Sequence, residues 1–542
     1  MTTSATSTAA GPRGITVAAA AWTAAAAVYA AMRLLAFVKL PVGGLELWSL
    51  SGAWQARAGI DDARYVPTLF QALSALLLRL DDSETLPRLA ALAASLTVPA
   101  SLFLLRRRIG EPAAIATLLV LAFDPLQIAF GPAATAAAFD VPLMAGILAA
   151  LAVLGPRPPV ITVAAFLFAA AGPLPLALLL AAALTHPRAD WRKPAAGFAA
   201  AGAALGVLAA SFGFGAGWQG ITVPPFDLVA AGFDAGWSTE TTRRLVALYA
   251  WGPAVVAGGY LAIRAARGRA ALLGDGLDRL FAAWFGVSLA WCFAAGGSRD
   301  PLAVLSLTAS AAPLAGRALA WLVDSLGSAD WRRAGWPLAG ALLAAATLLG
   351  PLLDWARLGR VGPGSEVVAV VVLAGVIAGG LTLLLRWPAT RAVAILPLAA
   401  AAAVPWLAGG FAVAGGSPNE PLPSPVTTLQ ASEIRDIVTG PARDPVGIVA
   451  IHPSLADALT WPLRGSRGLV AASRIPPNAS VVIWEAAGAP PEGFRTFEGR
   501  WAVLRERRGP DSGFLDYLRW LANRNTLPVR DLPAAVYIRE QP

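Results

Sequence analysis

Cysteine and histidine are nearly absent from this chain. Its 542 residues include one cysteine, Cys292, and two histidines, His186 and His452. A single cysteine excludes an intramolecular disulfide and a cysteine metal cluster. Two histidines exclude a histidine-rich metal site. Candidate chemistry must therefore be sought among other side chains, chiefly carboxylates and arginines.

Charge is also scarce. Only 14% of the residues are charged, 57% are hydrophobic, and the mean hydropathy is +0.62. Apolar runs recur from Ile15 to Ala414, and a run of about 20 residues can cross a bilayer. A soluble domain would not display so much apolar surface. The first run, 15–38, is long and lacks a convincing cleavage site, so we interpret it as a retained span rather than a signal peptide.

The net charge of +9 suggests nucleic-acid binding, but the positions of the basic residues argue against it. They lie on alternate short loops between apolar runs, the pattern of cytoplasmic loops in membrane proteins: Arg106 to Arg108, Arg188 to Lys193, Arg264 to Arg269, Arg332 and Arg333, and Arg386 to Arg391.

We therefore predict a multi-pass protein of a bacterial cell membrane, with membrane lipids and no nucleic acid as partners. About thirteen spans place the N-terminus in the cytoplasm and the C-terminus outside. The predicted spans are 15–38, 87–105, 112–127, 140–155, 159–172, 173–185, 194–213, 244–264, 279–296, 301–322, 335–353, 366–385 and 392–414.

Two isolated carboxylates fall on the outer side of this topology. Glu46 follows the first span, and Asp140 opens the span that follows the outer end of 112–127. Acidic residues at span ends on one membrane face are costly unless they have a function. The pair indicates an enzyme that works at the outer membrane surface.

The remaining segments define the domain organisation. Segment 41–86 combines charged residues with Trp48, Trp54 and Tyr65, which predicts helices lying along the outer interface. A linker at 415–430 precedes strand-like runs at 446–451, 480–484, 501–505 and 534–538 and helix-like segments at 432–438 and 513–524. The predicted fold is mainly α: a polytopic transmembrane helical bundle (1–414, with the outer interfacial loop 41–86) followed by a small extracytoplasmic α/β domain (431–542).

Several short motifs follow one another within this layout. Arg88 opens a span, a basic end runs from Arg106 to Gly110, the next span ends near Asp124-Pro125, and Asp140 opens another. The first outer loop carries an acid and a later Tyr65-Val66-Pro67, and Arg299 precedes a proline-containing span. In these motifs the chain resembles integral-membrane glycosyltransferases of the C superfamily, especially the protein mannosyltransferase and aminoarabinose transferase group. Trp461 to Arg464 is similar to a motif of a bacterial and archaeal flippase-associated branch.

The chain departs from this family pattern at two places. The family usually has Asp-Glu in its first outer loop, where this chain has Leu45-Glu46, so Glu46 is the one candidate at that motif. The loop before Asp140 is usually rich in arginine, whereas here it reads Gly131-Pro132-Ala133-Ala134-Thr135. The second change removes cations that could hold a phosphate or an acidic acceptor.

The resemblance implies an inverting transfer of a sugar from a polyprenyl-phosphate donor to an acceptor hydroxyl. Glu46 would be the general base, and Asp140 would orient the acceptor or help to hold a divalent cation. Tyr65 would contact the substrate. The leaving phosphate requires positive charge, for which Arg299 is the first candidate, followed by Arg243 and Arg244. The sugar, the need for a metal, and the nature of the acceptor (glycan, lipid or protein) stay open.

Other interpretations compete with this one. Glu46 could be a solvated interfacial acid, Asp140 could cap its helix, Asp124 could simply end its span, and Arg299 could pair with Asp300 or lipid headgroups. A flippase or transporter of lipid-linked sugars predicts polar residues deep within spans, whereas these spans contain mainly Ala, Leu, Val and Gly. A non-catalytic cell-envelope assembly factor is compatible with the altered motifs.

Overall fold

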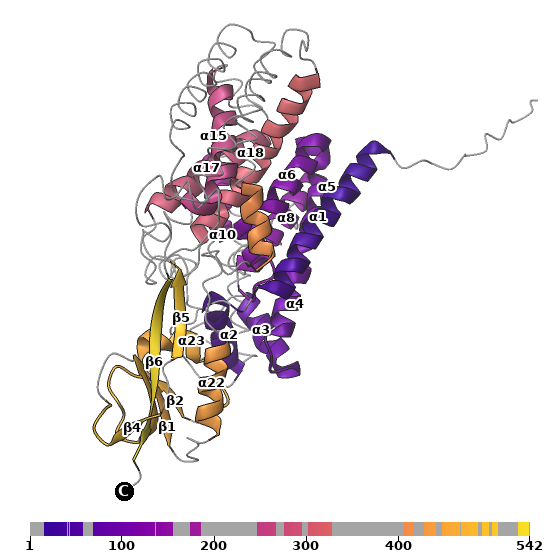
Figure 1. Ribbon diagram of the computed structural model, residues 1–542. Helices are drawn as coiled ribbons and strands as arrows, with labels where there is room; N and C mark the ends of the chain where they lie inside the picture. The colour runs from indigo at the N-terminus through magenta and orange to yellow at the C-terminus, as the bar shows by residue number, and fades with distance from the viewer. Residues whose placement is uncertain are drawn as a thin grey trace, which may run out of the picture.

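The protein combines a helical bundle with a small sheet domain at its C-terminal end (Figure 1). The computed structural model describes residues 16–40, 42, 44–57, 69–135, 137–154, 174–185, 246–266, 276–294, 302–327, 406–416, 428–440, 447–466, 468–485, 490–497, 501–507 and 529–540. The predicted spans 159–172, 194–213, 335–353 and 366–385 and the predicted helix at 513–524 lie outside these residues.

The first helices of the bundle follow the apolar runs of the sequence. Helix α1 (Val17–Lys39) begins where the Thr16 hydroxyl accepts a hydrogen bond from the Ala19 amide. Helices α4 (Thr85–Ser95) and α5 (Val98–Ile109) form one apolar stretch, which ends at Gly110 with φ of 90°. Glycine adopts this conformation without strain, so α6 (Glu111–Phe123) can begin at the next residue.

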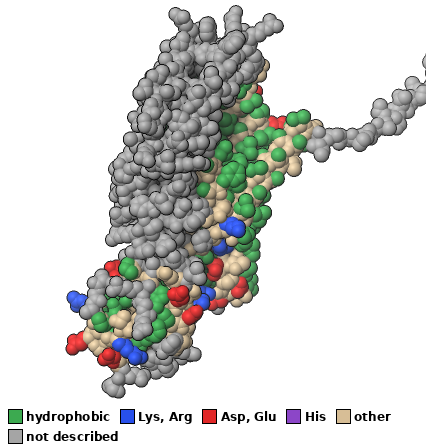
Figure 2. Space-filling model, viewed as in Figure 1, with side chains coloured by type: hydrophobic (Ala, Val, Ile, Leu, Met, Phe, Trp, Pro, Cys, Tyr) green, Lys and Arg blue, Asp and Glu red, His purple; other side chains and the backbone are tan. Residues whose placement is uncertain are grey.

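Further helices complete the described bundle: α7 (Pro125–Phe130), α8 (Ala137–Leu154), α10 (Leu174–Thr185), a π-helical turn (Val246–Ala250), α15 (Trp251–Ala266), α17 (Gly276–Ala294) and α18 (Leu302–Gly327). A last helical segment covers 406–414. By length and composition, three described stretches could cross a membrane: Val17–Lys39, Thr85–Ile109 and Ala303–Gly327. Figure 2 shows apolar side chains covering the α1 side of the bundle.

Two contacts fix which helix ends lie together. Near the start of α1, the Trp22 indole donates to the Glu111 carboxylate at 3.1 Å, which places this end beside the basic end of α5. At the other end of α1, Arg88 donates to the Leu40 carbonyl at 3.1 Å. A helix of this length spans about 34 Å. The basic cluster at Arg106 to Arg108 and the Arg88 region therefore lie at opposite ends of a membrane-length helix.

The C-terminal domain is built on a six-stranded mixed sheet in the order β2-β1-β3-β6-β4, with β5 also paired to β6. Its strands are β1 (Ile448–Ile451), β2 (Leu469–Ala471), β3 (Ala479–Glu485), β4 (Phe494–Thr496), β5 (Trp501–Arg507) and β6 (Val529–Arg539), and its helices are α22 (Thr428–Thr439) and α23 (Pro453–Leu459). Strands β1, β2 and β3 are parallel, and β6 runs antiparallel to β3, β4 and β5. The four strands predicted from sequence are confirmed, and β2 and β4 are additional.

One apolar core joins the sheet domain to helices α2 (Gly44–Arg57) and α3 (Leu69–Leu80). Leu47 and Leu50 of α2 and Leu78 of α3 share it with Ile451 and Val481 of the sheet. In Figure 1, α23 lies between the sheet and α2, and these two helices are in contact. The sheet domain therefore covers the helix that carries Glu46.

Candidate active site at the sheet-domain end of the bundle

Glu46 is buried in the first turn of α2, with 3% of its surface exposed. Its Oε1 accepts a hydrogen bond from the Ala134 amide at 2.8 Å. The same oxygen lies 3.0 Å from Nε of Arg88, on α4. The alternative interpretation of Glu46 as a solvated interfacial acid is therefore wrong. An unpaired buried charge is strongly unfavourable, and the Arg88 guanidinium and the Ala134 amide compensate the charge of Glu46.

Asp140 lies after the C-terminal end of the loop that binds Glu46, in helix α8. It is fully buried in the first turn of α8, which begins at Ala137, so it is not the capping residue of that helix. Next to it, Phe139 packs against Phe70 of α3 with ring centroids 5.2 Å apart. Because Ala134 binds Glu46 and Asp140 follows six residues later, the structure brings both predicted carboxylates to one region.

The loop between the two carboxylates, 131–135, packs against the side chain of Arg33 of α1. The Arg33 side chain is 1% exposed, donates to the Leu121 carbonyl at 2.9 Å, and stacks over the Tyr29 ring. A Cβ atom at Gly131 would lie 2.8 Å from Cδ and Nε of Arg33. The loop can therefore approach this buried arginine only because residue 131 is glycine.

Asp124 has a structural role in the same region. Its carboxylate caps α7 by accepting the amides of Leu126 at 2.9 Å and Gln127 at 3.2 Å. The Gln127 side chain donates in turn to Thr308 of α18 at 3.1 Å. This agrees with the interpretation that Asp124 ends the preceding span. The hydrogen bond from Gln127 to Thr308 also fixes α7, which directly precedes the 131–135 loop, against α18.

The predicted substrate-binding residues Tyr65, Arg243, Arg244 and Arg299 lie outside the described residues. Within the described part of the chain, no group of three or more His, Cys, Asp or Glu side chains could hold a metal ion.

From the sequence, Arg88 is recognised only as part of a family pattern, without a role in the site. A usable signal did exist: an arginine that opens an apolar span needs an anion at the same depth, and Glu46 is the first acid after the preceding span.

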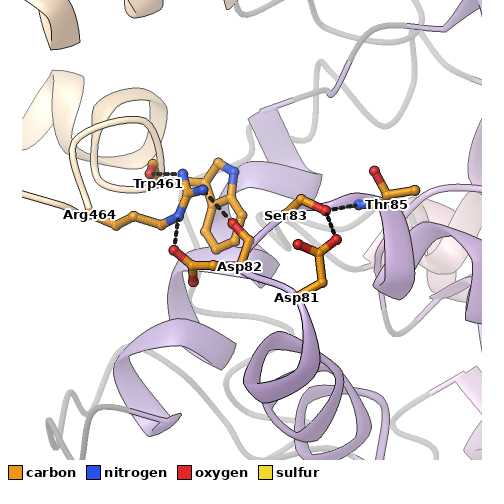
Figure 3. Close-up of polar contacts among 6 residues, drawn as sticks. All are labelled: Asp81, Asp82, Ser83, Thr85, Trp461 and Arg464. Atoms are coloured by element: carbon orange, nitrogen blue, oxygen red, sulfur yellow. Dashed lines mark hydrogen bonds and ion pairs between the residues drawn. The ribbon is translucent and has the colours of Figure 1, made fainter.

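The Trp461–Arg464 motif connects the sheet domain to the loop between α3 and α4 (Figure 3). The Arg464 guanidinium stacks on the Trp461 ring at 4.0 Å and donates to the Asp82 carbonyl at 2.6 Å. Its Nε lies 3.4 Å from the Asp82 carboxylate. Ser83 donates to Asp81 and accepts the Thr85 amide at the start of α4, so the loop is itself ordered by local hydrogen bonds. The motif is therefore a docking contact between the sheet domain and this loop.

Comparison with known proteins adds to this geometry. No protein-family model and no curated protein sequence matches the chain. Among solved structures, the crystal structure of ArnT from Cupriavidus metallidurans bound to undecaprenyl phosphate matches with a TM-score of 0.52 and 16% identity, over 95% of this chain and 97% of that chain. The chain has the fold of ArnT. The apo structure of ArnT from the same organism gives a TM-score of 0.49 and 18% identity, over 95% of this chain and 96% of that chain.

The match with ArnT spans both parts of the molecule, since it covers nearly all of each chain. It accounts for a mainly helical bundle followed by a small C-terminal sheet domain. At this identity the likeness is one of fold, and a fold does not by itself define an activity. The buried carboxylates and their partners are the features of this chain that bear on its chemistry.

Proposed function

We propose that this protein is a membrane glycosyltransferase that moves a sugar from a polyprenyl-phosphate donor to an acceptor hydroxyl at the outer membrane face. The observation that carries the proposal is the buried Glu46, held between Arg88 and the Ala134 amide in the region where α8 brings Asp140. The ArnT fold supports the donor class, because the matching ArnT structure holds undecaprenyl phosphate.

The reaction that suits this arrangement is a single displacement. The acceptor oxygen attacks the anomeric carbon, its proton passes to Glu46, and the bond between that carbon and the phosphate oxygen breaks. The lipid phosphate leaves with the bonding electron pair, and the anomeric centre is inverted. Asp140 orients the acceptor, and cations near the phosphate stabilise the charge that builds there.

The buried position of the two carboxylates suits this chemistry. Within a site that excludes water, hydrogen bonds and charges act more strongly than they do in solution. Both acids also lie on segments that are fixed by packing and hydrogen bonds, so a bound acceptor would meet a preorganised geometry. Arg299, Arg243, Arg244 and Tyr65 complete the proposal as phosphate and substrate contacts.

The first test is release of polyprenyl phosphate from a panel of polyprenyl-phosphate sugars by the full-length protein in lipid vesicles. General-base catalysis contributes about 10²- to 10⁴-fold, so we expect Glu46→Gln to lower the rate by about a hundredfold or more. Asp140→Asn should reduce it through loss of acceptor orientation. Nuclear magnetic resonance of the first-formed product should show the inverted anomer.

Glu84→Gln is the matched control, because Glu84 is an acid at the outer end of α4 that takes no part in the Arg88–Glu46 ion pair. It should leave the rate close to that of the wild type. Full sugar transfer by Glu46→Gln would reject the base assignment. A wild-type protein that neither hydrolyses nor transfers any donor would instead favour the assembly-factor interpretation.

A further inference from the structure

The ion pair between Glu46 and Arg88 poses a chemical problem for the proposed base. The two side chains are 4% and 11% exposed, and Nε of Arg88 lies 3.0 Å from Oε1 of Glu46. A neighbouring guanidinium favours the charged form of a carboxylate and makes it a weaker proton acceptor. In the described state the carboxylate is therefore restrained from acting as a base.

Separating this pair without a replacement anion would leave a buried cation uncompensated, which is strongly unfavourable. Among the residues that the structure describes, the other contacts of Arg88 do not supply the missing charge. They are the Leu40 carbonyl at 3.1 Å and the Phe37 ring at 5.4 Å, a neutral acceptor and an aromatic face. Release of Glu46 thus requires that another anion take its place beside Arg88.

We propose that Arg88 binds the phosphate of the polyprenyl donor and that this exchange of anions releases Glu46 for catalysis. The identity of the sugar donor rests on the function proposed above, whereas binding of the lipid phosphate can be tested without it. The phosphodiester of the donor carries one negative charge shared by two unesterified oxygens, as a carboxylate does, and guanidinium can bind either group with two parallel hydrogen bonds. The guanidinium remains paired throughout, and Glu46 keeps its hydrogen bond from the Ala134 amide.

The position of Arg88 suits a phosphate attached to a long apolar chain. It lies on α4 beside the outer end of α1, where these helices expose apolar side chains: Val38 is 73% exposed, Leu34 48%, Leu35 47% and Leu89 42%. The α1 side of the bundle is correspondingly apolar in Figure 2. An isoprenoid tail can therefore stay in the bilayer while its phosphate reaches Arg88 at the boundary.

The exchange couples the two substrates. Before the donor binds, Glu46 is restrained by Arg88, so a bound acceptor hydroxyl meets a weak base. After the donor binds, the phosphate takes Arg88 and the carboxylate becomes available. The same guanidinium is then placed to stabilise the charge that develops on the leaving phosphate.

Equilibrium binding of undecaprenyl phosphate to the full-length protein in nanodiscs tests the exchange. Arg88→Gln should weaken binding about tenfold or more, because a charge-assisted contact is lost. Glu46→Gln should strengthen binding, because the competing anion is removed. If the ion pair holds about nine-tenths of the free protein, apparent affinity should rise about tenfold. The control Glu84→Gln should bind as the wild type does.

The double variant Glu46→Gln with Arg88→Gln guards against misfolding, because it removes both members of the pair and leaves no uncompensated buried charge. It should bind as weakly as Arg88→Gln alone. Unchanged affinity in Glu46→Gln, or full affinity in the double variant, would overturn the exchange.

Sugar transfer separates this inference from the proposed function. The predicted binding pattern without sugar release from any donor would reject the transferase and leave the exchange intact. Measurable sugar release combined with unchanged binding in Glu46→Gln would reject the exchange alone.

Discussion

At the residue scale, the described bundle contains another buried acid, Asp278, whose environment predicts a different outcome from that of Glu46. Asp278, in the first turn of α17, forms ion pairs with Arg264 of α15 and Arg317 of α18. Two arginines on one carboxylate hold three helices together. The charge of Asp278 therefore has a structural role. It fixes the C-terminal end of α15 and the N-terminal end of α17 against α18.

Asp278→Asn should leave two partly buried arginines without their shared anion. Breaking such a pair costs about 3–5 kcal/mol, so we expect a clearly lower midpoint of thermal unfolding in detergent. Asp324→Asn is the matched control, because Asp324 is an exposed acid on α18. Equal midpoints for the two variants would contradict the structural role of Asp278.

At the element scale, the close approach of α18 to α6 depends on a small residue. A Cβ atom at Gly316 would meet the Thr117 hydroxyl and lie 2.6 Å from the Ala113 carbonyl oxygen. Small residues permit close backbone contact between helices in membranes. Both helices also lead towards the proposed site, since α6 ends at the residue before Asp124 and α18 carries Thr308.

Gly316→Ala should force these helices apart and destabilise the protein by about 1–3 kcal/mol, as overpacking does. The measurement is the unfolding midpoint of the purified variant. At Gly258 of α15 the same substitution meets nothing within 4 Å, so Gly258→Ala should be neutral or slightly stabilising. A neutral effect at both positions would show that α6 and α18 are not in close contact.

Elements with strong patterns could be predicted from sequence, and contacts between distant elements could not. Apolar length predicted the span at 15–38, observed as α1, and the span at 301–322, observed as α18. The turn at Leu96–Thr97 and the three-residue strands β2 and β4 are too short to leave a periodic signal. The hydrogen bond from Ala134 to Glu46 joins residues 88 positions apart. It depends on how α2 packs against the loop before α8, which no local pattern encodes.

At the scale of the whole molecule, the contact between Arg464 and Asp82 links the sheet domain to the loop between α3 and α4. Arg464→Glu and Asp82→Arg should each place like charges together and increase amide hydrogen exchange in α23 and in the 81–84 loop. The double charge swap should recover part of the protection, because it restores the charge pair, although the contacts of the Arg464 guanidinium with Trp461 and with the Asp82 carbonyl are lost. Arg435→Glu is the control, since Arg435 is exposed and pairs with its neighbour Asp436. Failure of the swap to recover protection would show that charge pairing does not hold the two parts together.

The core shared by α2, α3 and the sheet also has a consequence for the order of synthesis. A ribosome completes α2 and α3 early, but the strands that cover Leu47, Leu50 and Leu78 come from the far end of the chain. Until those strands exist, the newly made helices present an uncovered apolar face. The nascent protein therefore has to shelter this face, against lipid or a chaperone, for most of its own translation.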